Sequence, residues 1–250
     1  MRPPFGAART GTQASSRALS HLRFIPRGRN GTLFMIDGLF KRHIDPLWES
    51  MATPLIRIGM TPNQVTATGL ALVVLTSGLY LWHGNPLVFG VTLAFAFAFD
   101  ALDGAVARRR DMCTKSGGYF DAMVDRYQEL VVLAAIAAVA DLWWLALLAF
   151  SGGVLTSYAK ARTAIEIPIS NEAWPDLFER LERIIFLCAV LIAAGILPVA
   201  GIGARPVLAV GLGLYAALSH LTAVQRIARA VRLLQAADMR SAENNPGGGS

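Results

Sequence analysis

Six stretches of about 20 mostly apolar residues follow one another along the chain, and they constrain its fold more than any other feature. An α-helix needs about this length to cross the hydrocarbon core of a bilayer. Charged residues make up only 16% of the sequence, whereas soluble domains contain about 25%. We therefore predict an all-α integral membrane protein with six transmembrane helices. The predicted spans are 62–83, 86–107, 118–140, 142–162, 181–200 and 205–224.

Basic residues gather on one side of these spans. Lys and Arg are frequent before residue 62, within 108–115 and 160–183, and after residue 225, whereas the alternate connections carry little beyond Arg205. The positive-inside rule then predicts that both termini are cytoplasmic. The net charge of +6 follows from this topology, with attraction to anionic lipid headgroups as a second effect. No basic stripe is interleaved with aromatic residues on a soluble face, so we expect no nucleic-acid partner.

Four aspartates interrupt the second and third apolar stretches: Asp100, Asp103, Asp121 and Asp125. A carboxylate at the centre of a bilayer costs about 2.5–3.5 kcal/mol even on the mildest scale. Four unpaired carboxylates would cost on the order of 10 kcal/mol, which is comparable to the whole stability of a domain. A cation must therefore neutralise them.

The spacing of the aspartates predicts one shared site. Residues three or four positions apart lie on the same face of a helix, so Asp100 lies near Asp103, and Asp121 near Asp125. The short connection between the two stretches predicts antiparallel neighbouring helices whose acidic faces converge. Oxygen ligands without His or Cys suit Mg²⁺ or Mn²⁺, and two divalent ions would balance the four charges. A proton or cation pathway is the alternative, as are buried salt bridges such as Arg126–Glu129.

Small residues and one cation accompany the aspartates. Gly104, Ala107 and Gly117 leave room for a ligand close to the backbone, and Arg108 adds a fixed positive charge that suits a pyrophosphate oxygen. With the aspartates they form the pattern Asp-x2-Asp-Gly-x2-Ala-Arg-x8-Gly-x3-Asp-x3-Asp, from residue 100 to residue 125.

This pattern resembles the signature of the CDP-alcohol phosphotransferases, also called CDP-alcohol phosphatidyltransferases, at every fixed position. The resemblance covers about residues 34–235, including the six spans and the segment 61–66. It implies a transfer in which an acceptor hydroxyl attacks the phosphate of a CDP-linked donor and CMP departs, at the cytoplasmic edge of the bilayer. The roles it implies are metal ligation by Asp100, Asp103, Asp121 and Asp125, general-base catalysis by Asp125, and donor binding by Gly104, Ala107, Arg108 and Gly117.

Four cations farther along the chain are candidates for binding an anionic acceptor: Lys160, Arg162, Arg180 and Arg183. Headgroup contacts and salt bridges to Glu179 and Glu182 are the alternative. The surrounding sequence is similar to the branch that joins CDP-diacylglycerol, or an ether-lipid equivalent, to inositol phosphate. That branch commonly has proline where this chain has Leu181. The expected function is therefore phosphatidyl transfer to a small phosphorylated polyol in phospholipid biosynthesis.

Other functions remain open at this stage. Glycerol phosphate or serine would serve as acceptor in the same family, and CDP-choline or CDP-ethanolamine transfer to diacylglycerol is a further possibility. An Asp-rich prenyltransferase would separate its two acidic motifs more widely, and an ion-coupled transporter would carry ionisable groups through its later spans. We also expect a homodimer within the membrane lipids, since small residues permit close helix contacts. They include Gly195, Gly201, Gly211 and Gly213.

These features divide the chain into four segments. Thr61, Pro62 and Gln64 predict a capping box at the start of the first span. Apolar residues before it recur at helical spacing, which indicates an amphipathic helix in the membrane interface. A targeting peptide is the alternative for the basic N-terminal segment. The predicted segments are a disordered basic tail (1–32), an amphipathic juxtamembrane segment (33–58), a six-helix transmembrane catalytic domain (59–237) and a disordered tail (238–250).

Overall fold

The computed structural model describes residues 50–169, 174 and 177–244, and the side chains of these up to Ser241. The chain divides into two units, Met1–Ile36 and Asp37–Ser250, and every described residue belongs to the second unit. The described residues contain helices and no strand. The predicted tail 1–32 and most of the segment 33–58 lie outside them. Residues 50–57 are helical.

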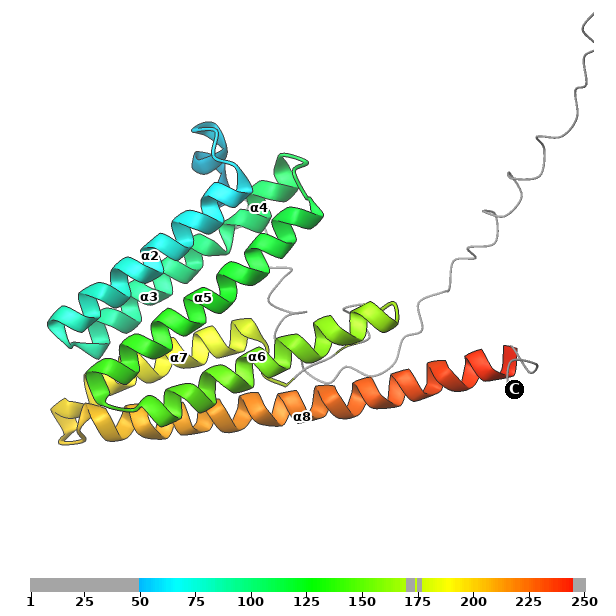
Figure 1. Ribbon diagram of the computed structural model, residues 1–250. Helices are drawn as coiled ribbons and strands as arrows, with labels where there is room; N and C mark the ends of the chain where they lie inside the picture. Colours follow the sequence, from blue (N-terminus) through cyan, green and yellow to red (C-terminus); the bar gives the residue numbers. More distant parts are fainter. Residues whose placement is uncertain (1–49, 170–173, 175–176, 245–250) are drawn as a thin grey trace, which may run out of the picture. The chain divides into compact units, whose positions relative to one another are not determined.

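A helix occupies each of the six predicted spans (Figure 1). The second span is divided at Ala101, and the last helix continues past residue 237, so our boundary for the C-terminal tail was wrong. Ala, Leu and Arg favour helix through residues 225–240, and the chain reaches Pro246 and three glycines only later. The helices are α2 (Pro62–His83), α3 (Pro86–Asp100), α4 (Leu102–Arg109), α5 (Lys115–Ala140), α6 (Trp143–Glu166), α7 (Arg180–Ile196), the 3₁₀ turn η2 (Leu197–Ala200) and α8 (Ala204–Asn244).

Side-chain caps fix the starts of the helices around the acidic residues. Thr61 Oγ1 accepts a hydrogen bond from the Gln64 backbone N–H, and Gln64 Oε1 accepts one from the Thr61 N–H at 2.9 Å. The predicted capping box is confirmed. At the start of α5, Thr114 Oγ1 accepts a hydrogen bond from the Gly117 N–H at 3.0 Å. Because the caps fix where α2 and α5 begin, they also fix which side chains face the space between these helices.

Four of the described helices are long and apolar enough to cross a membrane: Pro62–His83, Pro86–Arg109, Arg180–Ala200 and Ala204–Ser241. Helix α5 does not qualify because charged residues occupy its first half, and Trp, Ser, Gly and Tyr lower the mean hydropathy of α6. Large apolar side chains point outward from several helices, among them Trp82, Phe95 and Trp144. Apolar exposure on this scale marks a lipid-facing surface. The protein is an integral membrane protein.

Helix α2 brings the acidic segments together. It packs against α3 and α4 on one side and against α5 on the other, while α5 also contacts α6. The two acidic helices were predicted to pack directly on each other. Instead, both pack on α2, and their carboxylates meet beside it. Gly69 on α2 makes this possible, because a Cβ at that position would overlap the carboxylate of Asp100. The remaining helices form a second group in which α7 packs on α3, and α8 packs on α6 and α7.

Gly195 provides a test of helix packing. A Cβ at Gly195 would overlap the backbone of Leu87, so Gly195→Ala must push α7 away from α3. Overpacking of this kind costs about 1–3 kcal/mol. We expect a lower midpoint in thermal unfolding of the detergent-solubilised protein. Gly213→Ala is the matched control, since nothing lies within 4 Å of its added Cβ. Equal midpoints for the two variants would contradict the close packing of α3 and α7.

Candidate active site

Three carboxylates from two helices form a cluster. Asp100 ends α3, and Asp121 and Asp125 lie one turn apart on α5. One oxygen of each lies within 4.8 Å of the others. Asp100 is only 2% exposed, and its Oδ1 is buried without a hydrogen-bond partner among the described residues. A buried anionic oxygen without a partner is costly, so the cluster fits a divalent cation bound by oxygen ligands.

Asp103 is not one of these three carboxylates but borders the cluster, because its side chain contacts Asp121. Thr66 Oγ1 donates a hydrogen bond to its Oδ2 at 2.6 Å, and the Gly104 N–H donates to its Oδ1 at 2.5 Å. Of the four predicted metal ligands, the structure thus brings three together and places Asp103 at the wall of an adjoining pocket.

That pocket has a volume of about 420 Å³ and lies between the starts of α2 and α5 and the helix α4. Its size is within the range of small-molecule sites. The predicted small residues Gly104, Ala107 and Gly117 line it, together with Asp103 and Asp121. The cluster therefore borders this pocket through Asp121.

Arg108 lies beside the pocket rather than in its wall. Its Nη1 is 3.3 Å from the position that a Cβ on Gly104 would occupy, and its side chain is exposed. Asn63 and Lys115 also line the pocket, although sequence reasoning did not single them out. Asn63 belongs to the segment 61–66 that resembles the family, and Lys115 follows the capping residue Thr114, but neither fact by itself indicates a ligand.

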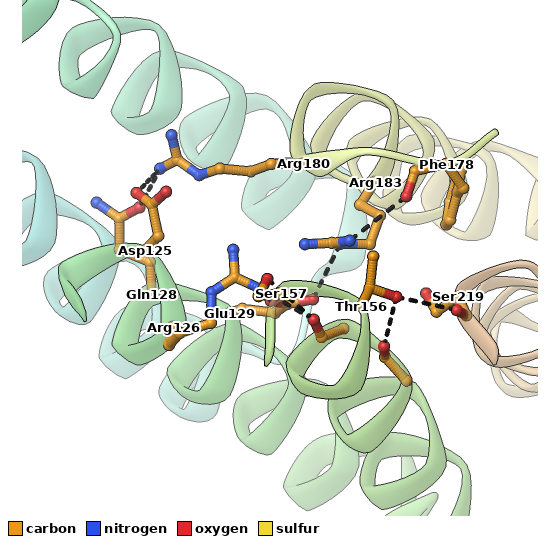
Figure 2. A network of polar contacts seen from close by, with 12 residues as sticks. Asp125, Arg126, Gln128, Glu129, Thr156, Ser157, Phe178, Arg180, Arg183 and Ser219 are labelled. Atoms are coloured by element: carbon orange, nitrogen blue, oxygen red, sulfur yellow. Dashed lines mark hydrogen bonds and ion pairs between the residues drawn. The ribbon is translucent and has the colours of Figure 1, made fainter. Parts of the chain in front are cut away.

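Arg180 reaches from α7 to the carboxylate cluster (Figure 2). Its Nη2 lies 2.8 Å from Asp100 Oδ2 and 2.5 Å from Asp125 Oδ1, and it donates to Gln128 Oε1 at 2.9 Å. The sequence predicted Arg180 as a ligand for an anionic acceptor. The structure places it on two of the predicted metal ligands, where a guanidinium and a divalent ion would share the same oxygens.

A second buried ionic group lies next to Asp125. Glu129 Oε2 accepts a hydrogen bond from Arg126 at 2.7 Å, which confirms the salt bridge considered from the sequence. Glu129 Oε1 lies 3.2 Å from Arg183 Nε. Arg183 is therefore paired with Glu129. The alternative prediction from the sequence was a salt bridge to Glu179 or Glu182.

The arginines of both groups line one small cavity. Arg126, Arg180 and Arg183 form its polar wall together with Asp125 and Glu129. Its volume of about 20 Å³ is enough for one water molecule. The site therefore has two sides, with Asp121 at the larger pocket and Asp125 at the arginine-lined cavity.

Lys160 and Arg162 are not among the residues that line this cavity. Arg162 forms an ion pair with Glu166 at 2.5 Å near the end of α6, and both side chains are about half exposed. Lys160 is half-buried on the same helix. Of the four predicted acceptor ligands, the structure thus brings Arg180 and Arg183 together.

Comparison with known proteins identifies the family. The family model for CDP-alcohol phosphatidyltransferases matches residues 59–230. The chain belongs to the CDP-alcohol phosphatidyltransferase family. This membership confirms the resemblance seen in the aspartate motif and makes the chain a transferase.

Two relatives are named as synthases of inositol phosphate lipids. The chain is 31% identical over 190 residues to archaetidylinositol phosphate synthase of Pyrococcus horikoshii, covering 75% of this chain and 92% of the relative. It is 31% identical over 207 residues to phosphatidylinositol phosphate synthase of Mycobacterium tuberculosis, covering 78% of this chain and 88% of the relative.

Solved structures of the Mycobacterium tuberculosis synthase are similar in fold. The crystal structure with CDP-DAG bound has a TM-score of 0.63 and 29% identity, over 74% of this chain and 94% of that one. The complex with manganese and citrate has a TM-score of 0.64 and 27% identity, over 73% of this chain and 88% of that one.

Proposed function

We propose that this protein transfers a phosphatidyl group from CDP-diacylglycerol, or an ether-lipid equivalent, to the hydroxyl of a phosphorylated polyol such as inositol phosphate. The observation that carries this proposal is the position of the carboxylate cluster between two unlike sites. Asp121 borders a pocket large enough for a nucleotide, and Asp125 borders a cavity lined by three arginines, which has room for one water molecule here and would have to widen to admit the acceptor phosphate. The names of the synthases it resembles, and the CDP-DAG in one of their structures, support the same pair of substrates.

The carboxylates would hold Mg²⁺ or Mn²⁺, with two ions balancing their charge. Asp100, Asp121 and Asp125 are the proposed ligands, and Asp103 would join them from the pocket wall. The manganese in a related structure supports this assignment. When bound, the ions supply positive charge that polarises a phosphate and stabilises the leaving group.

Asp125 is the proposed general base. Its carboxylate borders the arginine-lined cavity, so it would take the proton from the acceptor hydroxyl. The hydroxyl oxygen then forms a bond to the phosphatidyl phosphorus, and the bond from that phosphorus to the CMP oxygen breaks. On the donor side, Gly104, Ala107 and Gly117 admit the nucleotide close to the backbone, and Arg108 pairs with the departing phosphate.

The arginines would hold the phosphate of the acceptor. Arg180 is 32% exposed and reaches the cluster, so it is the strongest candidate for direct contact. Arg183 and Arg126 add positive charge to the same cavity. Lys160 and Arg162 of α6 remain candidate acceptor ligands by the positive charge that they carry. A phosphorylated acceptor suits this wall better than serine does, because a phosphate offers more negative charge to the guanidinium groups, whereas serine carries an ammonium group that they would repel.

Membrane topology completes the proposal. The catalytic unit would begin at residue 59 and end within α8, with all six predicted spans crossing the bilayer, and the acidic face of α5 would be shielded by α2 and α6. Both termini and the active site would lie on the cytoplasmic side, where a membrane lipid and a soluble acceptor can meet. The abundant Lys and Arg near the ends of α4 and α6 support this orientation. We also propose a homodimer.

An acceptor panel tests the proposed function. The purified protein in lipid vesicles with Mn²⁺ and radiolabelled CDP-diacylglycerol is given inositol phosphate, glycerol phosphate, serine or inositol. We expect the highest kcat/KM for inositol phosphate. Preference for glycerol phosphate or serine would contradict inositol phosphate as the acceptor but would agree with phosphatidyl transfer. Transfer from CDP-choline to diacylglycerol would also contradict CDP-diacylglycerol as the donor.

Gly104→Ala tests the donor side. Its added Cβ would lie 3.3 Å from Arg108 Nη1 and would narrow the pocket beside the nucleotide. We expect the KM for CDP-diacylglycerol to rise about tenfold, with the acceptor KM unchanged, since a displaced charged hydrogen bond is worth about 1.5–3 kcal/mol. Gly78→Ala on α2 is the control, because its Cβ would meet nothing within 4 Å. An unchanged donor KM in Gly104→Ala would remove this glycine from the donor site.

A further inference from the structure

One carboxylate holds side chains from three helices behind the arginine-lined cavity. Glu129 on α5 accepts hydrogen bonds from Arg126 of the same helix at 2.7 Å and from the Tyr215 hydroxyl of α8 at 2.6 Å. It also lies 3.2 Å from Arg183 Nε of α7. Figure 2 shows Glu129 between the two arginines, on the opposite side of Asp125 from Arg180. No step of the proposed reaction uses Glu129 or Tyr215.

The shape of the surroundings fixes Glu129 in place. A Cβ on Gly153 of α6 would overlap the Glu129 carboxylate, so this glycine leaves the space that the carboxylate fills. Arg126 Nη1 also lies 3.4 Å from the Gly153 carbonyl oxygen. Glu129 is 9% exposed and Arg183 3% exposed. Charges buried this deeply require a partner in good geometry, because removing one partner of such a pair costs several kcal/mol.

Tyr215 brings its hydroxyl to Glu129 from a fixed position. Its ring is 1% exposed and packs edge-to-face on Phe178, with ring centroids 5.5 Å apart. Phe186 of α7 lies against the same ring at 6.4 Å. The ring has little freedom to move, so its hydroxyl fixes the position of Glu129 Oε1. Tyr215 and both arginines paired with Glu129 line the cavity that also contains Arg180 and Asp125.

We infer that Tyr215 and Glu129 are positioning residues for the acceptor. Through its hydrogen bond, Tyr215 holds Glu129 where it keeps Arg126 and Arg183 in the wall of the cavity, so that both add positive charge beside Arg180 when the acceptor phosphate binds and the cavity widens. The inference rests on the proposed function, because it assigns the pair to the phosphate of the acceptor. Without the hydroxyl, Glu129 Oε1 loses the hydrogen bond from Tyr215 and turns toward the arginines, which lowers the positive charge available in the cavity.

Tyr215→Phe tests this role, since it removes the hydroxyl and keeps the packed ring. Replacing Glu129 instead would leave buried arginines unpaired and endanger the fold. We expect the KM for inositol phosphate to rise about tenfold, with kcat and the KM for CDP-diacylglycerol within twofold of wild type. Tyr80→Phe is the matched control. Tyr80 is also fully buried and stacks on Phe89 at 4.4 Å, but it lines neither the pocket nor the arginine cavity.

The outcomes separate this inference from the proposed function. An unchanged acceptor KM in Tyr215→Phe, or an equal rise in the KM of both substrates, would overturn the positioning role. The same holds if Tyr80→Phe raises the acceptor KM as much, since the effect would then reflect general packing. A wild-type protein that uses no phosphorylated acceptor would instead contradict the proposed function, and the inference with it.

Discussion

Asp125→Asn is expected to lower the rate of CMP release about a thousandfold while CDP-diacylglycerol still binds. An amide cannot accept the proton of the acceptor hydroxyl, and loss of a general base costs about 10²–10⁴ in rate. The substitution also removes the negative charge 2.5 Å from Arg180 and weakens the cation site. The donor pocket is lined by Asp121 and Asp103 instead, so donor affinity should change little. Steady-state CMP release and equilibrium binding of labelled donor measure the two effects.

Asp111→Asn provides the matched control for this prediction. It makes the same chemical change at an exposed aspartate that lines neither the pocket nor the cavity. Asp111 has φ of 51°, a conformation that asparagine accepts readily, so the backbone should not change. We expect wild-type turnover from this variant. Normal turnover in purified Asp125→Asn would exclude Asp125 as the base.

Arg180→Gln is expected to raise the KM for the phosphorylated acceptor about 10- to 100-fold, with the donor KM unchanged. A hydrogen bond to a charged group is worth about 1.5–3 kcal/mol, and glutamine keeps a polar side chain without the charge. Since Arg180 also contacts Asp100 and Asp125, its removal should leave Mn²⁺ affinity the same or higher. Equilibrium Mn²⁺ binding, measured without substrates, provides a reading independent of activity.

Arg232→Gln is the control for Arg180→Gln. Arg232 lies exposed on α8 and lines neither the pocket nor the cavity, so both substrate KM values should match wild type. Two results would contradict the role given to Arg180. One is an acceptor KM equal to that of Arg232→Gln. The other is a loss of Mn²⁺ binding, because Arg180 would then only hold the carboxylates in place for the metal and would not bind the acceptor.

Local sequence rules predicted the parts of the fold that local interactions determine. The capping box at Thr61 depends on residues three positions apart and was read correctly. Helical spacing placed Asp121 and Asp125 on one face of α5, which the cluster confirms. The same rule predicted that Asp103 lies near Asp100, and the structure places Asp103 beside the cluster, in contact with Asp121.

Contacts between distant residues were beyond the sequence. Arg180 is 80 positions from Asp100, and Tyr215 is 86 positions from Glu129. Both contacts depend on how α7 and α8 pack against the other helices, which no local pattern encodes. The sequence therefore indicated an arginine-rich acceptor region, but it could not show that Arg180 reaches the carboxylates or that Glu129 commits Arg183 to a buried ion pair.

Hydropathy shows a similar limit. Six apolar stretches were visible in the sequence, yet α5 and α6 are not among the helices that composition alone marks as membrane-spanning. The charged residues of α5 contact one another and α7 inside the protein, as Glu129 and Arg126 do. Charged residues that form an internal polar site exclude a helix from a composition-based search for membrane spans, whichever way its other faces point.

The stoichiometry of transfer tests the central claim most directly. Purified protein in vesicles of CDP-diacylglycerol with Mn²⁺ is supplied with inositol phosphate, and CMP and the lipid product are quantified together by mass spectrometry. The proposed function predicts one phosphatidylinositol phosphate for each CMP, and negligible CMP when the acceptor is omitted. CMP released at the same rate without the acceptor, or a lipid product that lacks the phosphorylated polyol, would contradict it.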